Sequence, residues 1–576
     1  GYGFDAGDLA GEGAVRFEIT RPMRRSVPYE DIGFDVSGRF TGASGPSGIG
    51  EIRFEEGDLT FRADSEGMLV TGDIQVGRSR ARLDWNERFR AADGQPSTQV
   101  RIVSNADARD LDLAGIEARS IIDGRIGLDA AFSGNGFSFD RHVVLADLTD
   151  AALAFPDGLW TKPRGLPAAL ELVTGRTPSG GVAIERLAML GDGLDVQGAA
   201  ELASDGQLVG ADMTRMVLGD QADLTLQASR PEGEDGPLQI DIEGRFFDAS
   251  QWLDSVISSG LSAEGGLGEM VLSASIDAVQ VGEVRYAGVM LAMTGDDAGM
   301  QSLQLDASLP RGPVRMAITP QEAGGRVLQV ETSDAGALLT TLGGFGNITG
   351  GALRIDATMP PAGTPGGMQG RISANGFRLE RMPLLTRILA AGSLEGLGSL
   401  LSGQGIDFEQ MEMEFTLLDG LVEMREGRVA GPALGLTWSG IVDTQGERLN
   451  LNGTILPSYG LNSLLGNLPL VGELLTSRRG EGVIGVTFTA EGPFETTRVT
   501  ANPLSALAPG VLRRIFEGTS ALRELEALEA RRQEQGTPPV DIMDAEESGD
   551  LPEGEDKPED GPPENEQTAD GEPGED

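Results

Sequence analysis

The chain has 576 residues, with 90 acids against 45 bases and a formal net charge of −45. Such an acidic balance excludes proteins that bind nucleic acid through a basic surface, because neutralising phosphates requires Lys and Arg. The absence of cysteine excludes thiolate zinc sites, and the single histidine, His142, argues against His-dependent triads.

The composition favours a protein made of many strands. Glycine is abundant, with 84 residues, whereas aromatic residues make up only 5%. This combination suits short strands joined by tight turns better than a compact aromatic core. No run of 18 apolar residues is present, so we expect no transmembrane helix in this sequence. Since the sequence begins at Gly1 without an initiator Met, we expect it to be a fragment of a longer protein, although a soluble cytoplasmic protein would look the same by this test.

Residues 1–253 are interpreted as a first β region. Residues 52–56 and 59–63 predict a hairpin that turns at Gly57-Asp58. A short helix is expected near 248–258, where the region closes. Further strands are predicted at 68–74, 81–85, 222–228 and 238–242, from hydrophobic residues that alternate with polar ones.

Residues 254–370 continue the same pattern. Leu303, Leu305 and Leu309 alternate with polar residues, as expected for a strand. A short helix is predicted at 335–342, and its stop is the glycine pair Gly343-Gly344. No strict sequence period is present, so the strands repeat without the fixed sequence motif of a solenoid such as a leucine-rich repeat.

Residues 371–518 form the third predicted region, with helices near 382–402 and 459–475. Its strands have a period of two, which places apolar side chains on one face of a sheet and polar ones on the other. One dry and one wet face is typical of antiparallel sheets. The candidates for the dry face are Met411, Met413, Phe415, Leu417, Leu449, Leu451, Ile455, Ile484, Val486 and Phe488.

The C-terminal end divides into two predicted segments. A helix is expected over 509–534, and its outer part forms a charged segment at 519–536 with an apolar seam. Residues 537–576 contain 16 acids and one base, together with many Pro and Gly. Such a segment cannot bury a core, so we predict a disordered acidic tail.

Several short motifs occur in a characteristic order within residues 371–518. They include Met382-Pro-Leu-Leu385, Gly405-Ile-Asp-Phe408, Gly453-Thr-Ile-Leu-Pro457 and Asn502-Pro-Leu-Ser-Ala-Leu-Ala-Pro-Gly510. In this order they resemble the C-terminal region of the AsmA-like proteins, most closely the YhdP-like branch of this TamB-related superfamily. Residues 244–253 resemble the same branch more weakly.

The resemblance implies a protein of the Gram-negative cell envelope. It would be anchored in the inner membrane by an N-terminal helix and project into the periplasm. A long curved β groove would act in bridge-like lipid transfer and outer membrane biogenesis. The implied partners are phospholipids, the inner membrane and envelope proteins at the C-terminal end.

The apolar stripes can be interpreted in two ways. They form a dry core between layers, or they line an open groove that binds acyl chains. The groove interpretation gains support because the stripes are aliphatic and Met-rich, and because few predicted helices are available to cover them. We therefore expect an elongated, curved, mainly antiparallel sheet that forms a hydrophobic groove, with a few short helices.

The search for catalytic motifs is negative. The chain contains no G-x-S-x-G, H-E-x-x-H or Walker A sequence, and Gly343-Gly-Phe-Gly346 lacks the third glycine of a dinucleotide fingerprint. We expect no enzyme activity, cofactor or metal. A structural or adhesive envelope β-protein remains the main alternative, and an enzyme that acts on lipids or glycans is the third.

Overall fold

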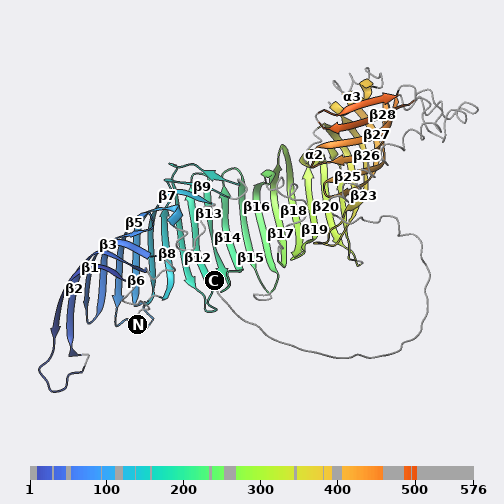
Figure 1. The fold of residues 1–576 in the computed structure, drawn as a ribbon. Helices are drawn as coiled ribbons and strands as arrows, with labels where there is room; N and C mark the ends of the chain where they lie inside the picture. Colours follow the sequence, from blue (N-terminus) through green and yellow to red (C-terminus); the bar gives the residue numbers. More distant parts are fainter. Residues whose placement is uncertain are drawn as a thin grey trace, which may run out of the picture. The chain divides into compact units, whose positions relative to one another are not determined.

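One curved, open β-sheet contains all the strands that the structure describes (Figure 1). This computed structural model describes residues 9–28, 31–46, 53–92, 94–110, 121–136, 138–155, 159–231, 236–251, 268–322, 324–342, 347–380, 382–391, 405–457, 485–494 and 496–502. All of them belong to one unit of the chain, within Gly1–Glu517.

The first strands are β1 (Ala10–Thr20), β2 (Gly33–Pro46), β3 (Arg53–Asp64), β4 (Gly67–Val76), β5 (Ser79–Arg88), β6 (Thr98–Asp107), β7 (Ile122–Asn135), β8 (Ser138–Asp147), β9 (Ala151–Ala154), β10 (Thr161–Lys162), β11 (Ala168–Arg176), β12 (Val182–Gly191), β13 (Leu194–Leu202), β14 (Leu208–Leu218), β15 (Ala222–Ser229) and β16 (Leu238–Asp248). The later strands are β17 (Met270–Val281), β18 (Val284–Asp296), β19 (Gly299–Leu309), β20 (Gly312–Pro320), β21 (Arg326–Thr332), β22 (Ile348–Met359), β23 (Met368–Leu379), β24 (Ile406–Leu418), β25 (Leu421–Ala430), β26 (Leu434–Asp443), β27 (Arg448–Pro457), β28 (Val486–Pro493) and β29 (Arg498–Asn502).

Neighbours in the sheet are neighbours in the chain. From β1 to β8 and from β11 to β29 each strand pairs with the next, and β8 pairs with β11. Many connections are tight hairpins, such as the Asp419-Gly420 turn, in which both residues have positive φ as a type I′ turn requires. The expected mainly antiparallel, curved sheet is confirmed.

A single pair of described strands is parallel. β16 runs in the same direction as β17, with Ile240 beside Leu272, and the connection between them passes through residues 252–267, outside the described part. Strand pairing continues across 253/254, and β23 spans 370/371. The sheet therefore shows no break at either of these two predicted boundaries between regions.

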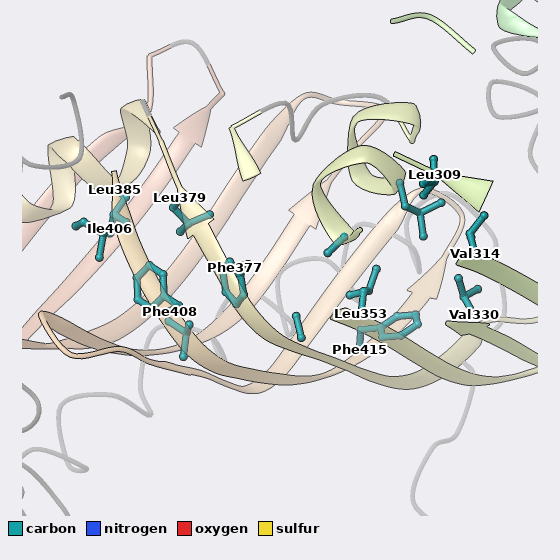
Figure 2. Packing of buried hydrophobic residues seen from close by; sticks show 14 of the residues in the cluster. Leu309, Val314, Val330, Leu353, Phe377, Leu379, Leu385, Ile406, Phe408 and Phe415 are labelled. Atoms are coloured by element: carbon teal, nitrogen blue, oxygen red, sulfur yellow. The ribbon is translucent and has the colours of Figure 1, made fainter. Parts of the chain in front are cut away.

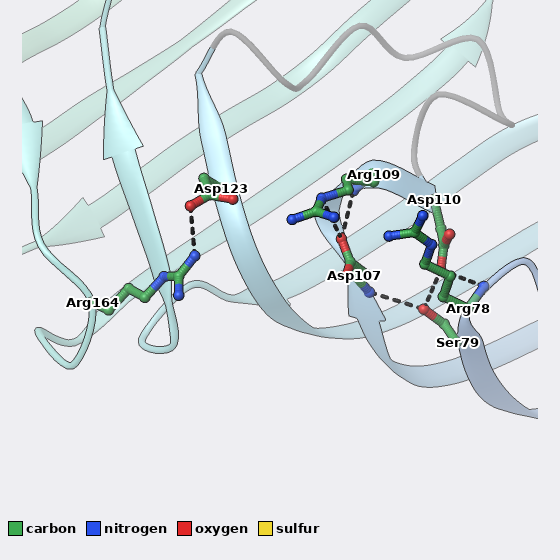
Figure 3. A network of polar contacts seen from close by, with 7 residues as sticks. All are labelled: Arg78, Ser79, Asp107, Arg109, Asp110, Asp123 and Arg164. Atoms are coloured by element: carbon green, nitrogen blue, oxygen red, sulfur yellow. Dashed lines mark hydrogen bonds and ion pairs between the residues drawn. The ribbon is translucent and has the colours of Figure 1, made fainter.

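β9 and β10 form a small hairpin that branches from the long run of strands β1–β8 and β11–β29, which we call the main sheet. β9 follows β8 after a turn and pairs with the first residues of β7, and β10 pairs with β9. Arg164 holds this hairpin to β7 through an ion pair with Asp123, 2.5 Å long (Figure 3). The buried Lys162 ammonium donates hydrogen bonds to the carbonyls of Ala151 and Leu166, at 2.7 and 2.9 Å.

Two helices lie in the described part. α2 (Ala335–Thr341) confirms the helix expected at 335–342, and Asp334 caps it by accepting a hydrogen bond from the Ala337 amide. α3 (Pro383–Ala391) accounts for the first half of the helix expected at 382–402. The expected helices at 459–475 and 509–534 and the segments at 519–536 and 537–576 lie outside the described residues, as does most of 248–258.

The hairpin predicted around Gly57-Asp58 is wrong. β3 runs through these residues as one strand, with a register irregularity between Glu55 and Asp58. Glu56 takes a positive φ of 47°, so the extra residue is absorbed as a bulge instead of reversing the chain. The Gly-Asp pair therefore marks a kink in a long strand.

Candidate functional site: an apolar face that crosses the sheet

One row of cross-strand neighbours runs along the whole main sheet on its apolar face. We call it the central row. Its members are apolar residues or glycines on every strand except β8 and β11, which contribute His142 and Thr174. From β1 to β15 the row is Val15, Gly38, Phe61, Val70, Trp85, Val100, Phe132, His142, Thr174, Ile184, Ala200, Ala211 and Ala228. From β16 to β29 it is Ile240, Leu272, Met293, Leu303, Ile318, Leu328, Ala357, Gly370, Phe415, Met424, Gly440, Leu451, Ala490 and Val499.

A second row lies beside the central row over part of the sheet. It runs from β14 to β24 and contains apolar residues only. Its members are Met213, Leu226, Ile242, Ala274, Leu291, Leu305, Met316, Val330, Ile355, Ile372 and Met413. The parallel step between β16 and β17 does not interrupt either row, because the alternation of faces is kept across it.

The opposite face carries ordered ion pairs between neighbouring strands. Arg371 contacts Glu414 at 2.6 Å, and Arg378 contacts Asp407 at 2.7 Å. The hydrogen bond from Arg378 holds the pKa of the Asp407 carboxyl below its usual range. This charged face and the apolar face give the sheet two chemically distinct sides.

The sequence candidates lie at the C-terminal end of the apolar face, where it is closed. Phe415, Ile455, Val486 and Phe488 are buried, and Ile455 is completely buried. Leu385, Ile388 and Leu389 of α3 belong to the same buried cluster as Phe415, Ile455 and Phe488. Figure 2 shows Leu385 close to Ile406 and Phe408.

The remaining candidates are half-buried, and Ile484 lies outside the described residues. Met411, Met413, Leu417, Leu449 and Leu451 pack against the same cluster as partly buried neighbours. The candidates therefore contribute to a packed interior at this end of the sheet, as well as sharing its apolar face.

The apolar face is more open around β15–β18. Leu226, Ile240, Leu272, Leu291 and Met293 are half-buried. They belong to none of the three buried clusters found in the described part of the chain. Strands were predicted at β15 and β16 but not at β17 or β18, and none of these residues was among the predicted site residues. The alternation of apolar and polar residues along each strand is visible in the sequence. The alignment of the apolar residues in continuous rows across strands depends on strand register.

Two polar pairs interrupt the apolar face. His142 Nδ1 lies 3.0 Å from Thr174 Oγ1, and burial lowers the pKa of the imidazole. Closer to the N-terminus, the Thr98 hydroxyl donates to the buried Glu87 carboxylate at 2.7 Å. Each of these polar groups thus has a partner on an adjacent strand.

The polar side of β27 is drier than its alternation predicted. Asn452 and Thr454 are buried, although they point away from the apolar face. Thr489 donates a hydrogen bond to Asn452 Oδ1 at 2.9 Å. The expectation of a uniformly wet second face therefore fails here, because the sheet is buried on both sides at β27.

Two shallow hollows open near the charged face. The larger, of about 560 Å³, includes Val103, Leu145 and Leu190, and the smaller, of about 310 Å³, lies among Arg315, Glu331 and Arg354. The described residues contain no group of three His, Cys, Asp or Glu side chains placed to hold a metal ion. Within the same residues, no helix is long and apolar enough to span a bilayer.

Comparison with known proteins identifies no family for this chain. No protein-family model, no curated protein and no solved structure matches this chain.

Proposed function

We propose that this protein binds phospholipid acyl chains along the apolar face and lets them move from strand to strand. The observation that carries the proposal is the central row, which stays apolar over almost every strand of the main sheet. Acyl chains suit this face because burying each CH₂ group is favourable by about 0.8 kcal/mol. Lipid headgroups would remain in water at the edge of the face.

Movement along such a face requires no chemical step. One leaflet of a bilayer is about 15 Å deep in its hydrocarbon part, so an extended acyl chain covers roughly three strands spaced about 4.8 Å apart. Moving by one strand replaces one set of aliphatic contacts with an equivalent set. The barrier to movement stays low as long as the rows contain no unpaired charge.

The resemblance to AsmA-like proteins supports a role for this activity in the Gram-negative envelope. In this proposal the chain is the periplasmic part of an inner-membrane-anchored protein that supports lipid transport to the outer membrane. The anchor and the envelope partners at the C-terminal end are parts of the same proposal.

Photo-crosslinking on the intact chain tests the proposal. A photoreactive residue at Met293 or Leu272 should crosslink to co-purifying phospholipid, which mass spectrometry of the adduct identifies. The same residue at Ala292, the exposed neighbour on the charged face, is the matched control. Equal crosslinking from both faces, or none from either, would refute a one-sided lipid site.

A structural or adhesive role is the second candidate. It is favoured by the packed C-terminal end, where Ile455 and Ala490 are completely buried and Phe488 nearly so. A purely structural protein should release no lipid on extraction and should give no adduct at Met293.

A further inference from the structure

β1 is an unusually exposed edge of the sheet. Among the described residues it pairs on one side only, with β2. Val15, Phe17 and Ile19 lie on the apolar face and are 54%, 61% and 56% exposed. An edge strand with apolar side chains and free backbone groups is a template for pairing with another strand.

Two charged side chains of β1 also lack an ion-pair partner within the described part of the chain. Arg16 and Glu18 lie on the charged face, where they make no ion pair with any described residue, unlike Arg39 and Arg62 on the following strands. Glu18 even lies opposite Asp35 of β2. Within the described residues, the strand therefore presents an apolar row on one face and the opposite charges of Arg16 and Glu18, without ion-pair partners, on the other.

We propose that β1 pairs antiparallel with β1 of a second copy of this chain, about a two-fold axis through Phe17. In this register Phe17 meets the second copy's Phe17, and Val15 meets its Ile19. Arg16 faces the second copy's Glu18, and Glu18 faces its Arg16. The strand is thus self-complementary on both faces, as a symmetric interface requires.

Other antiparallel registers are less favourable. A shift by one residue would set apolar side chains against polar ones, because the two faces alternate. Axes through Arg16 or Glu18 bring like charges together. An axis through Ala14 pairs Glu12 with Arg16, but it leaves Phe17 opposite Gly11 and loses the aromatic contact.

The pairing would join the two sheets edge to edge and keep their apolar faces on the same side. The contact is small, because it rests on one strand from each copy, so the dimer should form only at high protein concentration. The inference stands independently of lipid binding, since it rests on the edge and charges of β1.

Charge reversal provides the test, with light scattering and sedimentation of the intact chain over a wide concentration range. The unaltered protein should dimerise. Arg16→Glu should weaken this self-association by about tenfold or more, because both cross-copy pairs become repulsive. Glu18→Arg should do the same. The double variant Arg16→Glu/Glu18→Arg should regain the original affinity.

The two single variants mixed together should form a heterodimer. In the mixed pair, each acidic side chain of the Arg16→Glu copy faces a basic side chain of the Glu18→Arg copy, so both cross-copy pairs are again attractive. Cysteine pairing reports the register in this cysteine-free chain: Val15→Cys mixed with Ile19→Cys should form a disulfide on oxidation, and neither variant alone should. Far-ultraviolet circular dichroism checks that each variant is folded. The proposal is overturned if the protein stays monomeric over the whole concentration range, or if charge reversal leaves the affinity of the dimer unchanged.

Discussion

A single charge on the apolar face should stop lipid movement without unfolding the protein. Met293 on β18 is the chosen position, because it is half-buried between Leu272 and Leu303 and belongs to no buried cluster in the described part. In Met293→Asp, the new carboxylate keeps partial access to water when no lipid is bound. Val486, by contrast, is 5% exposed, and a charge there would disrupt the packed end.

The magnitude follows from the geometry of the rows. An acyl chain that passes the introduced carboxylate loses the contact of about three CH₂ groups, or ~2 kcal/mol, which corresponds to roughly a 30-fold lower rate. Covering the carboxylate adds several kcal/mol more. The total amount of bound lipid should fall only slightly, because an acyl chain covers about three strands and the rest of the face is unchanged.

Transfer of labelled phospholipid between donor and acceptor vesicles measures the rate, and extraction with mass spectrometry measures the bound lipid. Ala292→Asp is the control, since Ala292 is exposed between Ser273 and Gln304 on the charged face. If both variants slow transfer equally, or neither does, the one-sided track is wrong. A large loss of bound lipid in Met293→Asp would instead indicate one discrete site.

Three further predictions concern stability. Ile455→Ala should lower the free energy of unfolding by about 2–5 kcal/mol in urea titrations, and Met293→Ala should cost much less, because Ile455 is completely buried whereas Met293 is half-buried. Because burial lowers the pKa of His142, the unfolded chain binds a proton at this imidazole more readily than the folded chain does. The free energy of unfolding should therefore fall as the pH drops below about 6.5. Melting curves recorded over a range of pH should show that His142→Phe loses this dependence. Arg371→Gln should leave the melting temperature unchanged, because its ion pair with Glu414 is exposed.

The sequence by itself predicted a mainly β fold and the two faces of its alternating strands. Alternation over 411–417 assigned Phe415 to the apolar side without any tertiary information, because side chains of an extended chain point to alternate faces. The local sequence also predicted α2, with its stop at the glycine pair that follows. It failed at Gly57-Asp58, where a bulge and a turn share the same residue signals and only pairing with β2 and β4 separates them.

Strand register and coverage were decided by the tertiary structure. Leu272 becomes the neighbour of Ile240 only through the parallel pairing of β16 with β17, which no local sequence pattern indicates, and Met293 follows beside Leu272 on β18. Ile455 and Met293 occupy similar alternating positions in sequence, yet Ile455 shares a buried cluster with Leu385 of α3, whereas Met293 belongs to no such cluster among the described residues. Alternation fixes the direction of each side chain along its own strand, whereas burial depends on what the rest of the chain brings above it.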